Sequence, residues 1–222
     1  MAGGRDAVRM VRAVSAPIPD LLLDGPSGAS VTLLLAPGAG AGAASPGMAA
    51  ISGALAAEGL RVARWEFGFR ASGRPPPRAE TLVPEVAAAL DVLGAAGPVV
   101  IGGKSMGGRV ASLAADPLRA QGRIAGLLCL GYPFHPPGRP ERPRTAHLAA
   151  LQTPTLIVQG TRDPFGMPDE VADYALSAAI ALHWLDDGDH DLKPRKRLTG
   201  LSHADHLAAM AARVAAWTRC LP

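Results

Sequence analysis

The chain has 222 residues, of which 48% are hydrophobic and 18% charged, and this balance excludes an intrinsically disordered protein. The formal net charge is only +3, and the basic residues collect in segments 70–78, 139–144 and 193–197, which mostly lack interleaved aromatic residues. We therefore expect one domain over residues 1–222, with the basic segments as solvated loops and no nucleic-acid partner.

The lack of a recognisable signal peptide or membrane span, together with the cysteine usage, favours a cytoplasmic protein. Residues 1–6 lack the apolar core of a signal peptide, and no stretch reaches the ~18 uninterrupted apolar residues of a membrane span. The two cysteines, Cys129 in an apolar run and Cys220 near position 222, do not suggest a disulfide framework. We expect reduced thiols and no membrane association.

Strand-like and helix-like segments alternate along the chain. The first part of the chain is expected to form one or two short strands in 8–24, a strand at 31–35, a glycine-rich turn at 37–42, a helix at 48–58 and a strand at 60–67. A loop at 68–78, a helix at 82–93, a strand at 99–101 and a helix that stops at Pro117 are expected next. The remaining expected elements are strands at 124–130 and 155–158, a helix at 168–176, a strand at 180–185 and a helix through 207–217. Ser202 and Asp205 are spaced like a capping box for the last helix. Continuously apolar strands that alternate with helices predict a mostly parallel sheet with helices on both faces.

Residues 103–107, Gly-Lys-Ser-Met-Gly, fit the G-x-S-x-G pattern of a nucleophile elbow. A serine on so sharp a turn needs small neighbours, which Gly103 and Gly107 provide, and the turn puts Ser105 at a helix N-terminus, where negative charge is favoured. The alternative is a strand-to-helix turn without chemistry. A P-loop is excluded, because Pro98 stands where that motif has its first glycine.

Functional groups of a parallel sheet gather at the carboxyl ends of its strands. Ser105, Asp163 and His190 each follow an expected strand, and they occur in the Ser-Asp-His order of an α/β-hydrolase triad. His190 would take the proton of the serine hydroxyl, and Asp163 would orient the imidazole. The backbone N–H groups of Met106 and Ala39 would form the oxyanion hole.

Other interpretations of these residues stay open. Asp163 could be an Asp-Pro turn and His190 a surface histidine, with His135, in the loop after another expected strand, as the strongest competing base. The aspartate-rich run 186–191 resembles a metal cluster but lacks EF-hand spacing and a second suitably placed histidine. We therefore predict no metal and no cofactor.

Five stretches together resemble the α/β-hydrolases, close to their small dienelactone-hydrolase-like members and, more narrowly, to the branch that includes a subunit of the NSL histone-acetyltransferase complex. They are residues 35–41, 102–109, 131–135, 159–164 and 188–193. The resemblance implies an α/β-hydrolase fold and the triad named above. Pro37 stands where related hydrolases often have histidine, which leaves the backbone donors intact. Serine instead of cysteine as the nucleophile argues against dienelactone hydrolase activity.

The function that these features predict is a serine hydrolase that cleaves a carboxylic ester or similar acyl bond of a small molecule through an acyl-enzyme. The segment 132–145 is too short for a large cap domain, so we expect an open pocket. Residues expected at this pocket are Gly38, Gly40, Phe67, Phe69, Lys104, Tyr132 and Phe134, and Lys104, Arg109 and Lys193 indicate an anionic substrate. The alternatives are a non-catalytic protein-interaction module, as in the NSL-related branch, and an acyltransferase.

Overall fold

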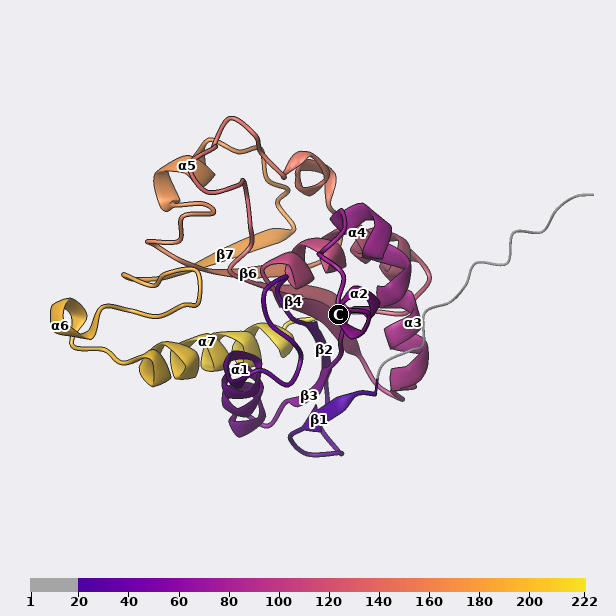
Figure 1. The fold of residues 1–222 in the computed structure, drawn as a ribbon. Helices are drawn as coiled ribbons and strands as arrows, with labels where there is room; N and C mark the ends of the chain where they lie inside the picture. Colours follow the sequence, from indigo (N-terminus) through magenta and orange to yellow (C-terminus); the bar gives the residue numbers. More distant parts are fainter. Residues whose placement is uncertain (1–19) are drawn as a thin grey trace, which may run out of the picture.

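A seven-stranded sheet runs through the part of the chain that the structure, a computed structural model, describes, which is residues 20–222 (Figure 1). Its strands lie in the order β1-β3-β2-β4-β5-β6-β7. Their bounds are β1 (Leu22–Asp24), β2 (Thr32–Ala36), β3 (Arg61–Arg64), β4 (Val99–Lys104), β5 (Gly126–Leu130), β6 (Thr155–Gly160) and β7 (Ile180–Leu185). Only β1 pairs antiparallel, and the other neighbouring strands pair parallel, as the continuously apolar sequences predict.

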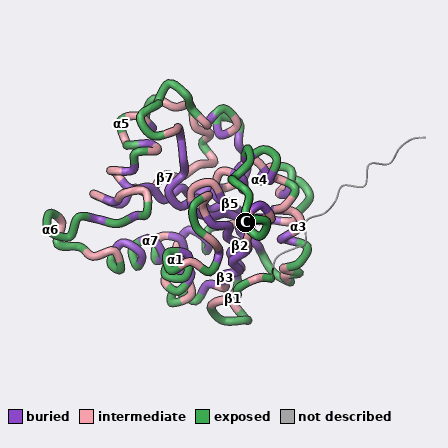
Figure 2. The backbone as a smooth tube through the Cα atoms, in the orientation of Figure 1, coloured by how far each residue is buried: buried purple, intermediate pink, exposed green. Residues whose placement is uncertain are grey.

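Helices cover both faces of the sheet. The α-helices are α1 (Pro46–Ala57), α2 (Gly68–Ala71), α3 (Val83–Leu93), α4 (Met106–Ala120), α5 (Pro168–Ala172), α6 (Lys196–Thr199) and α7 (His203–Thr218). Successive strand residues point to opposite faces, so Leu33 and Leu35 pack with α1 and α7, whereas Leu34 and Ile101 pack with α3 and α4. The buried backbone in Figure 2 accordingly follows the central strands. This confirms the predicted α/β-hydrolase architecture without a large cap domain.

The structure corrects several predicted element bounds. The helix expected to stop at Pro117 continues to Ala120, because a proline in the last turn forfeits only its own hydrogen bond while Leu118 still packs into the core. Helix α5 has five residues and ends at Ala172 instead of 176. The short α2 lies in the expected loop 68–78, and α6 was not expected. Within 8–24 only β1 can be compared, since residues 8–19 lie outside the described part.

Capping at α7 agrees with the sequence. The Ser202 hydroxyl accepts a hydrogen bond from the Asp205 N–H at 3.2 Å, and the Asp205 carboxylate accepts one from the Ser202 N–H at 2.7 Å. The reciprocal pair is the predicted capping box.

None of the helices in residues 20–222 has the length and apolar character needed to cross a lipid bilayer.

The two cysteines are free thiols, as expected, and they differ in environment. Cys129 is buried in β5, where burial raises the pKa of its thiol, and Cys220 is exposed after α7. Because the thiolate is the reactive form, only Cys220 is expected to react with a thiol reagent in the folded protein.

Thiol counting with 5,5′-dithiobis(2-nitrobenzoate) checks this expectation. One equivalent should react in buffer and two in denaturant, and the Cys220→Ser variant should show none until it unfolds. Rapid reaction of both thiols in buffer would contradict the buried position of Cys129.

Candidate active site

The elbow that carries Ser105 joins the end of β4 to the start of α4. Ser105 has φ 51° and ψ −115°, a conformation that costs a non-glycine residue about 1–3 kcal/mol. The surrounding chain holds it there, because the Ser105 N–H donates to the Leu130 carbonyl at 2.9 Å and its own carbonyl accepts from the Arg109 N–H at 3.1 Å. The hydroxyl is thereby raised at the carboxyl edge of the sheet.

Glycines beside the elbow let α4 approach β2 closely. A Cβ on Gly107 would lie 2.4 Å from the Ala36 carbonyl oxygen and 2.7 Å from that of Pro37, and one on Gly103 would lie 2.2 Å from the Ala36 oxygen. The clashing atoms are backbone and cannot turn away. The glycines of the motif are therefore required sterically.

Replacing Gly107 with alanine is expected to destabilise the protein by about 1–3 kcal/mol, because the methyl group pushes against the backbone of the turn after β2. The matched control is Gly53→Ala in α1, where a Cβ meets nothing within 4 Å and helix propensity predicts a gain of about 0.5–1 kcal/mol. Urea unfolding of both variants measures the difference. Equal free energies of unfolding for the two variants would contradict this prediction, because the backbone around Gly107 would then accommodate a methyl group without cost.

Ser105, His190 and Asp163 form one hydrogen-bonded chain, although they lie far apart in sequence. The His190 Nε2 is 2.9 Å from the Ser105 Oγ, and its Nδ1 is 2.8 Å from the Asp163 Oδ2. A carboxylate only accepts hydrogen bonds, so Nδ1 carries the proton and donates, which leaves Nε2 to accept from the serine hydroxyl. The structure therefore brings together all three residues that the sequence put forward as a triad.

The carboxylate of Asp163 is fully buried and is held by further donors. The Phe165 N–H donates to its Oδ1 at 2.9 Å, and the Gln159 side-chain amide donates to its Oδ2 at 2.9 Å. These bonds compensate for the loss of hydration and fix the carboxylate against the imidazole.

The loops that carry Asp163 and His190 are joined to each other. The Arg162 N–H donates to the Gly188 carbonyl at 2.9 Å, and the Asp187 N–H donates to the Thr161 hydroxyl at 2.7 Å. A Cβ on Gly160 would lie 2.2 Å from the Gly188 oxygen, so glycine is needed where the two loops meet. The parallel pairing of β6 and β7 and these contacts set the distance between acid and base.

The turn after β2 lies beside the serine, where the second oxyanion donor was predicted. A Cβ on Gly38 would lie 3.4 Å from the Ser105 Cβ. Arg70 donates to the Ala39 carbonyl at 3.4 Å, and Glu66 accepts from the Ala43 N–H at 2.9 Å, so two side chains brace this turn. Met106 is the first residue of α4, and its N–H therefore has no carbonyl one turn back in the helix to donate to.

Two cavities open on either side of Ser105 and share Ala39, Ser105 and Phe165. The arginine cavity has a volume of about 720 Å³, and its other lining residues are Pro76, Pro77, Arg78, Ala79, Glu80, Met106, Arg109, Pro133, Arg142 and Arg144. The His190 cavity has a volume of about 670 Å³, and its other lining residues are Gly38, Gly40, Ala41, Ser45, Gly47, Met48, Ile51, Lys104, His190, Asp191, Lys193 and His203.

Gly38, Gly40 and Lys104, three of the predicted binding residues, line the His190 cavity. Lys104 is nearly buried, and burial lowers the pKa of its ammonium, which forms an ion pair with Asp191 at 3.3 Å. This ion pair ties the elbow to the loop of His190. A role for Lys104 in substrate binding stays a prediction.

The prediction that Tyr132 and Phe134 border the pocket is wrong. Both are fully buried, pack edge-to-face with ring centroids 4.9 Å apart, and line neither cavity. The chain after β5 turns inward, where aromatic rings bury large areas. Phe67 and Phe69 are also buried in the core rather than at a pocket.

Phe165 lines both cavities and was not among the residues predicted from the sequence. Its ring lies over the imidazole of His190, with the centroids 4.2 Å apart. Its position in the sequence could have indicated this role, because it lies two residues after Asp163 in a loop that must reach His190.

The competing basic and metal-binding residues do not form such a site. His135 is buried and bonded to Glu170 at 3.2 Å, away from Ser105. A second serine–histidine pair, Ser112 and His147 at 2.8 Å, lies mid-helix against a short 3-10 turn, and over residues 20–222 no carboxylate contacts the other nitrogen of that imidazole. The described residues also hold no His, Cys, Asp or Glu cluster suited to a metal ion.

A serine elbow after a central parallel strand, with an aspartate and a histidine in loops after later strands, is the arrangement of the α/β-hydrolases. A family model described as alpha/beta hydrolase domain matches residues 29–219. The chain therefore belongs to this family.

Solved structures with the same fold agree with the assignment. A serine hydrolase without a lid from Xanthomonas campestris superimposes with a TM-score of 0.68 at 20% identity, covering 91% of this chain and 89% of that one. A dienelactone hydrolase from Anabaena variabilis gives 0.67 at 21% identity, with 90% of each chain covered. The esterase domain of a Rhodothermus marinus protein gives 0.63 at 18% identity, covering 91% of this chain and 93% of the other.

Proposed function

We propose that this protein is a serine hydrolase that cleaves a carboxylic ester or similar acyl bond of a small molecule. The observation that carries the proposal is the continuous hydrogen-bonded chain from the Ser105 hydroxyl through His190 to the buried Asp163 carboxylate. A serine hydroxyl is too weak an acid to attack a carbonyl near pH 7 unless a positioned base takes its proton.

In this proposal the reaction has two halves. The Ser105 oxygen attacks the acyl carbon while its proton passes to the His190 Nε2, and the Asp163 carboxylate stabilises the imidazolium that results. The negative oxygen of the tetrahedral intermediate accepts hydrogen bonds from the N–H groups of Met106 and Ala39. His190 then gives its proton to the leaving group, and a water molecule, activated by the same imidazole, releases the acid from the serine.

Two features of the site cost free energy to maintain, and they support catalysis over a purely scaffolding role. Ser105 sits in a conformation that costs free energy, and Asp163 is a fully buried carboxylate whose contacts include the imidazole of His190. A protein-interaction module has no need of either feature. Both cavities open at Ser105, so a substrate has access to the nucleophile.

A series of 4-nitrophenyl esters with acyl chains of two to eight carbons tests the proposal. We expect turnover that saturates with substrate and a preference within the series set by the cavities. Repeating the assay with added methanol and analysing the products separates hydrolysis from acyl transfer, because a transferase yields mainly the methyl ester. No turnover of any ester by folded protein would favour the non-catalytic module.

A further inference from the structure

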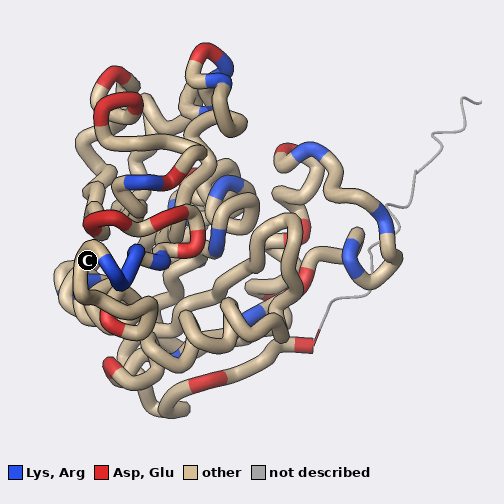
Figure 3. The backbone as a smooth tube through the Cα atoms, turned by 60° about the vertical axis from the view of Figure 1, so that its left-hand side comes forward, with Lys and Arg blue, Asp and Glu red and all other residues tan. Residues whose placement is uncertain are grey.

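Four arginines from three separate segments line the arginine cavity. Arg78 follows the proline run 75–77, Arg109 lies in the first turns of α4, and Arg142 and Arg144 lie in the loop after β5. Glu80 is the only acidic side chain among the lining residues, so the lining carries a formal charge of +3. Figure 3 shows the basic and acidic positions along the backbone.

These arginines are poorly neutralised within residues 20–222. Arg109 pairs with Glu80 at 2.6 Å, yet its Nε is buried and has no hydrogen-bond partner. Arg78, Arg142 and Arg144 form no ion pair with a carboxylate of the described chain. Burial, together with the charges of Arg109 and Arg142, lowers the pKa of Arg144, which shows that the positive charges of the cluster repel one another.

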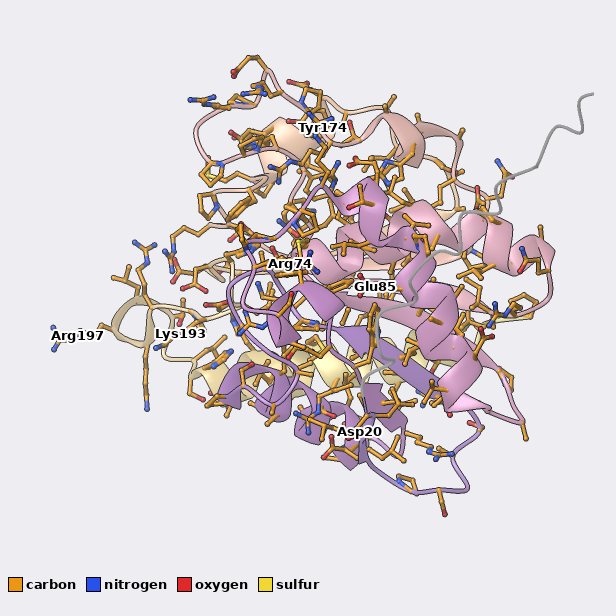
Figure 4. All side chains as sticks on the ribbon, turned by 45° about the vertical axis from the view of Figure 1, so that its right-hand side comes forward. Asp20, Arg74, Glu85, Tyr174, Lys193 and Arg197 are labelled. Atoms are coloured by element: carbon orange, nitrogen blue, oxygen red, sulfur yellow. The ribbon has the colours of Figure 1, made fainter. Side chains whose placement is uncertain are left out.

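The three basic segments differ in where their side chains point. Solvated loops were expected for all three basic segments. In the third segment Arg197 lies in α6 and points away from the body of the protein (Figure 4), whereas Lys193 lines the His190 cavity. In the other two segments, Arg78, Arg142 and Arg144 instead turn toward the cavity beside the nucleophile.

The position of His190 distinguishes the two halves of a bound ester. The imidazole must protonate the leaving group, so the leaving group has to lie on the side of Ser105 that His190 lines. His190 lines the other cavity and is absent from the lining of the arginine cavity. The arginine cavity is therefore left for the acyl half.

We propose, building on the serine hydrolase function above, that the arginine cavity binds an oxyanionic group at the far end of the acyl chain. Preferred substrates are then half-esters of dicarboxylic acids, or esters of acids that carry a phosphonate or phosphate. Guanidinium groups bind such oxyanions through paired, charge-assisted hydrogen bonds. The donors available for this purpose are the guanidinium groups of Arg78, Arg142 and Arg144, which line the cavity and form no ion pair within the described residues.

The test compares matched substrates on the wild-type protein. The 4-nitrophenyl half-ester of adipic acid and its neutral methyl ester have the same chain and leaving group and differ in charge. We expect kcat/KM to be roughly 10- to 100-fold higher for the charged ester, the range of one or two hydrogen bonds to a charged group. The preference should shrink in 1 M salt. A 5-phosphonopentanoate ester, which has the same four methylene groups and is run in parallel, tells which oxyanion fits better.

Variants locate the effect. Arg144→Gln is expected to lower the ratio of kcat/KM for charged over neutral ester about 10-fold, and Arg142→Gln, at an exposed position where folding is tolerant, serves if the first variant misfolds. Arg139→Gln, in the same loop but outside the cavity lining, should leave the ratio unchanged.

The outcomes separate the two proposals. Equal or faster turnover of the neutral ester by wild type would overturn the anionic acyl group while leaving the hydrolase function in place. An unchanged ratio in Arg144→Gln and Arg142→Gln would also overturn it. Absence of turnover with every ester, charged or neutral, would count against the hydrolase function itself.

Discussion

Replacing Ser105 with alanine is expected to lower kcat for ester hydrolysis by about 10⁴- to 10⁶-fold. The variant loses the atom that attacks the acyl carbon, and His190 is left without the hydroxyl that it contacts at 2.9 Å. Alanine is also less strained than a larger residue at φ 51°, so the fold should survive. Steady-state kinetics with 4-nitrophenyl butyrate, together with circular dichroism of the variant, measures the effect.

Ser112 provides the matched control, since it forms the other serine–histidine pair of the described chain, with His147. Ser112 is buried in the middle of α4, where it also donates to the Arg109 carbonyl, and it lines neither cavity at Ser105. Ser112→Ala should therefore keep kcat/KM within a few-fold of wild type. If Ser112→Ala were inactive and Ser105→Ala active, the nucleophile would have been assigned to the wrong serine.

Asp163→Asn is expected to lower kcat by about 10⁴-fold, the effect of disabling the carboxylate in other Ser-His-Asp sites. An asparagine amide turned toward His190 donates to Nδ1, which forces the proton onto Nε2 and removes the acceptor that Ser105 needs. The Phe165 N–H still finds an oxygen at the Oδ1 position, whereas the Gln159 amide, which donates to the same Oδ2 that faces His190, loses its acceptor on residue 163. KM should change little by comparison, because Asp163 does not line either cavity at Ser105.

Asp169→Asn is the control for this substitution, because Asp169 is an exposed aspartate at the start of α5, six residues after Asp163. Its activity should match that of wild type. A fall of less than 10-fold in Asp163→Asn would mean that the buried carboxylate is structural and that His190 works without it.

Most of the fold could be predicted because its strands are apolar on both faces. Residues 31–35 and 99–101 have no polar face, as expected for strands of a parallel sheet covered by helices on both sides, and the fully buried β2 and β4 lie there. The errors fall on short helices and helix ends. Helix α5 and the passage of α4 through Pro117 depend on tertiary packing, which local propensity does not contain.

The hydrogen-bonded chain at the site was also predictable, because parallel strands bring their carboxyl ends to one edge whatever their separation in sequence. To propose the triad, it was enough to ask which functional residues follow the expected strands. These residues include Ser105, Asp163 and His190. The pocket walls were not predictable in this way. Whether Tyr132 turns inward and Phe165 outward depends on the path of each loop, and the sequence carries no periodic signal for that path.

The arginine cavity shows the same limit. Arg78 and Arg144 are separated by more than sixty residues and lie in proline-rich loops, where composition alone predicts solvated side chains. Their convergence beside Ser105 follows from how the two loops pack over the start of α4.

Mapping the site of a fluorophosphonate adduct tests the central claim most directly, because this reagent labels a serine only when a neighbouring base has activated it. Mass spectrometry of the intact folded protein should show one adduct, and the digest should assign it to the peptide that contains Ser105, with no adduct after denaturation beforehand. An unlabelled folded protein, or an adduct on Ser112 instead, would contradict the assignment of Ser105, His190 and Asp163 as a working triad.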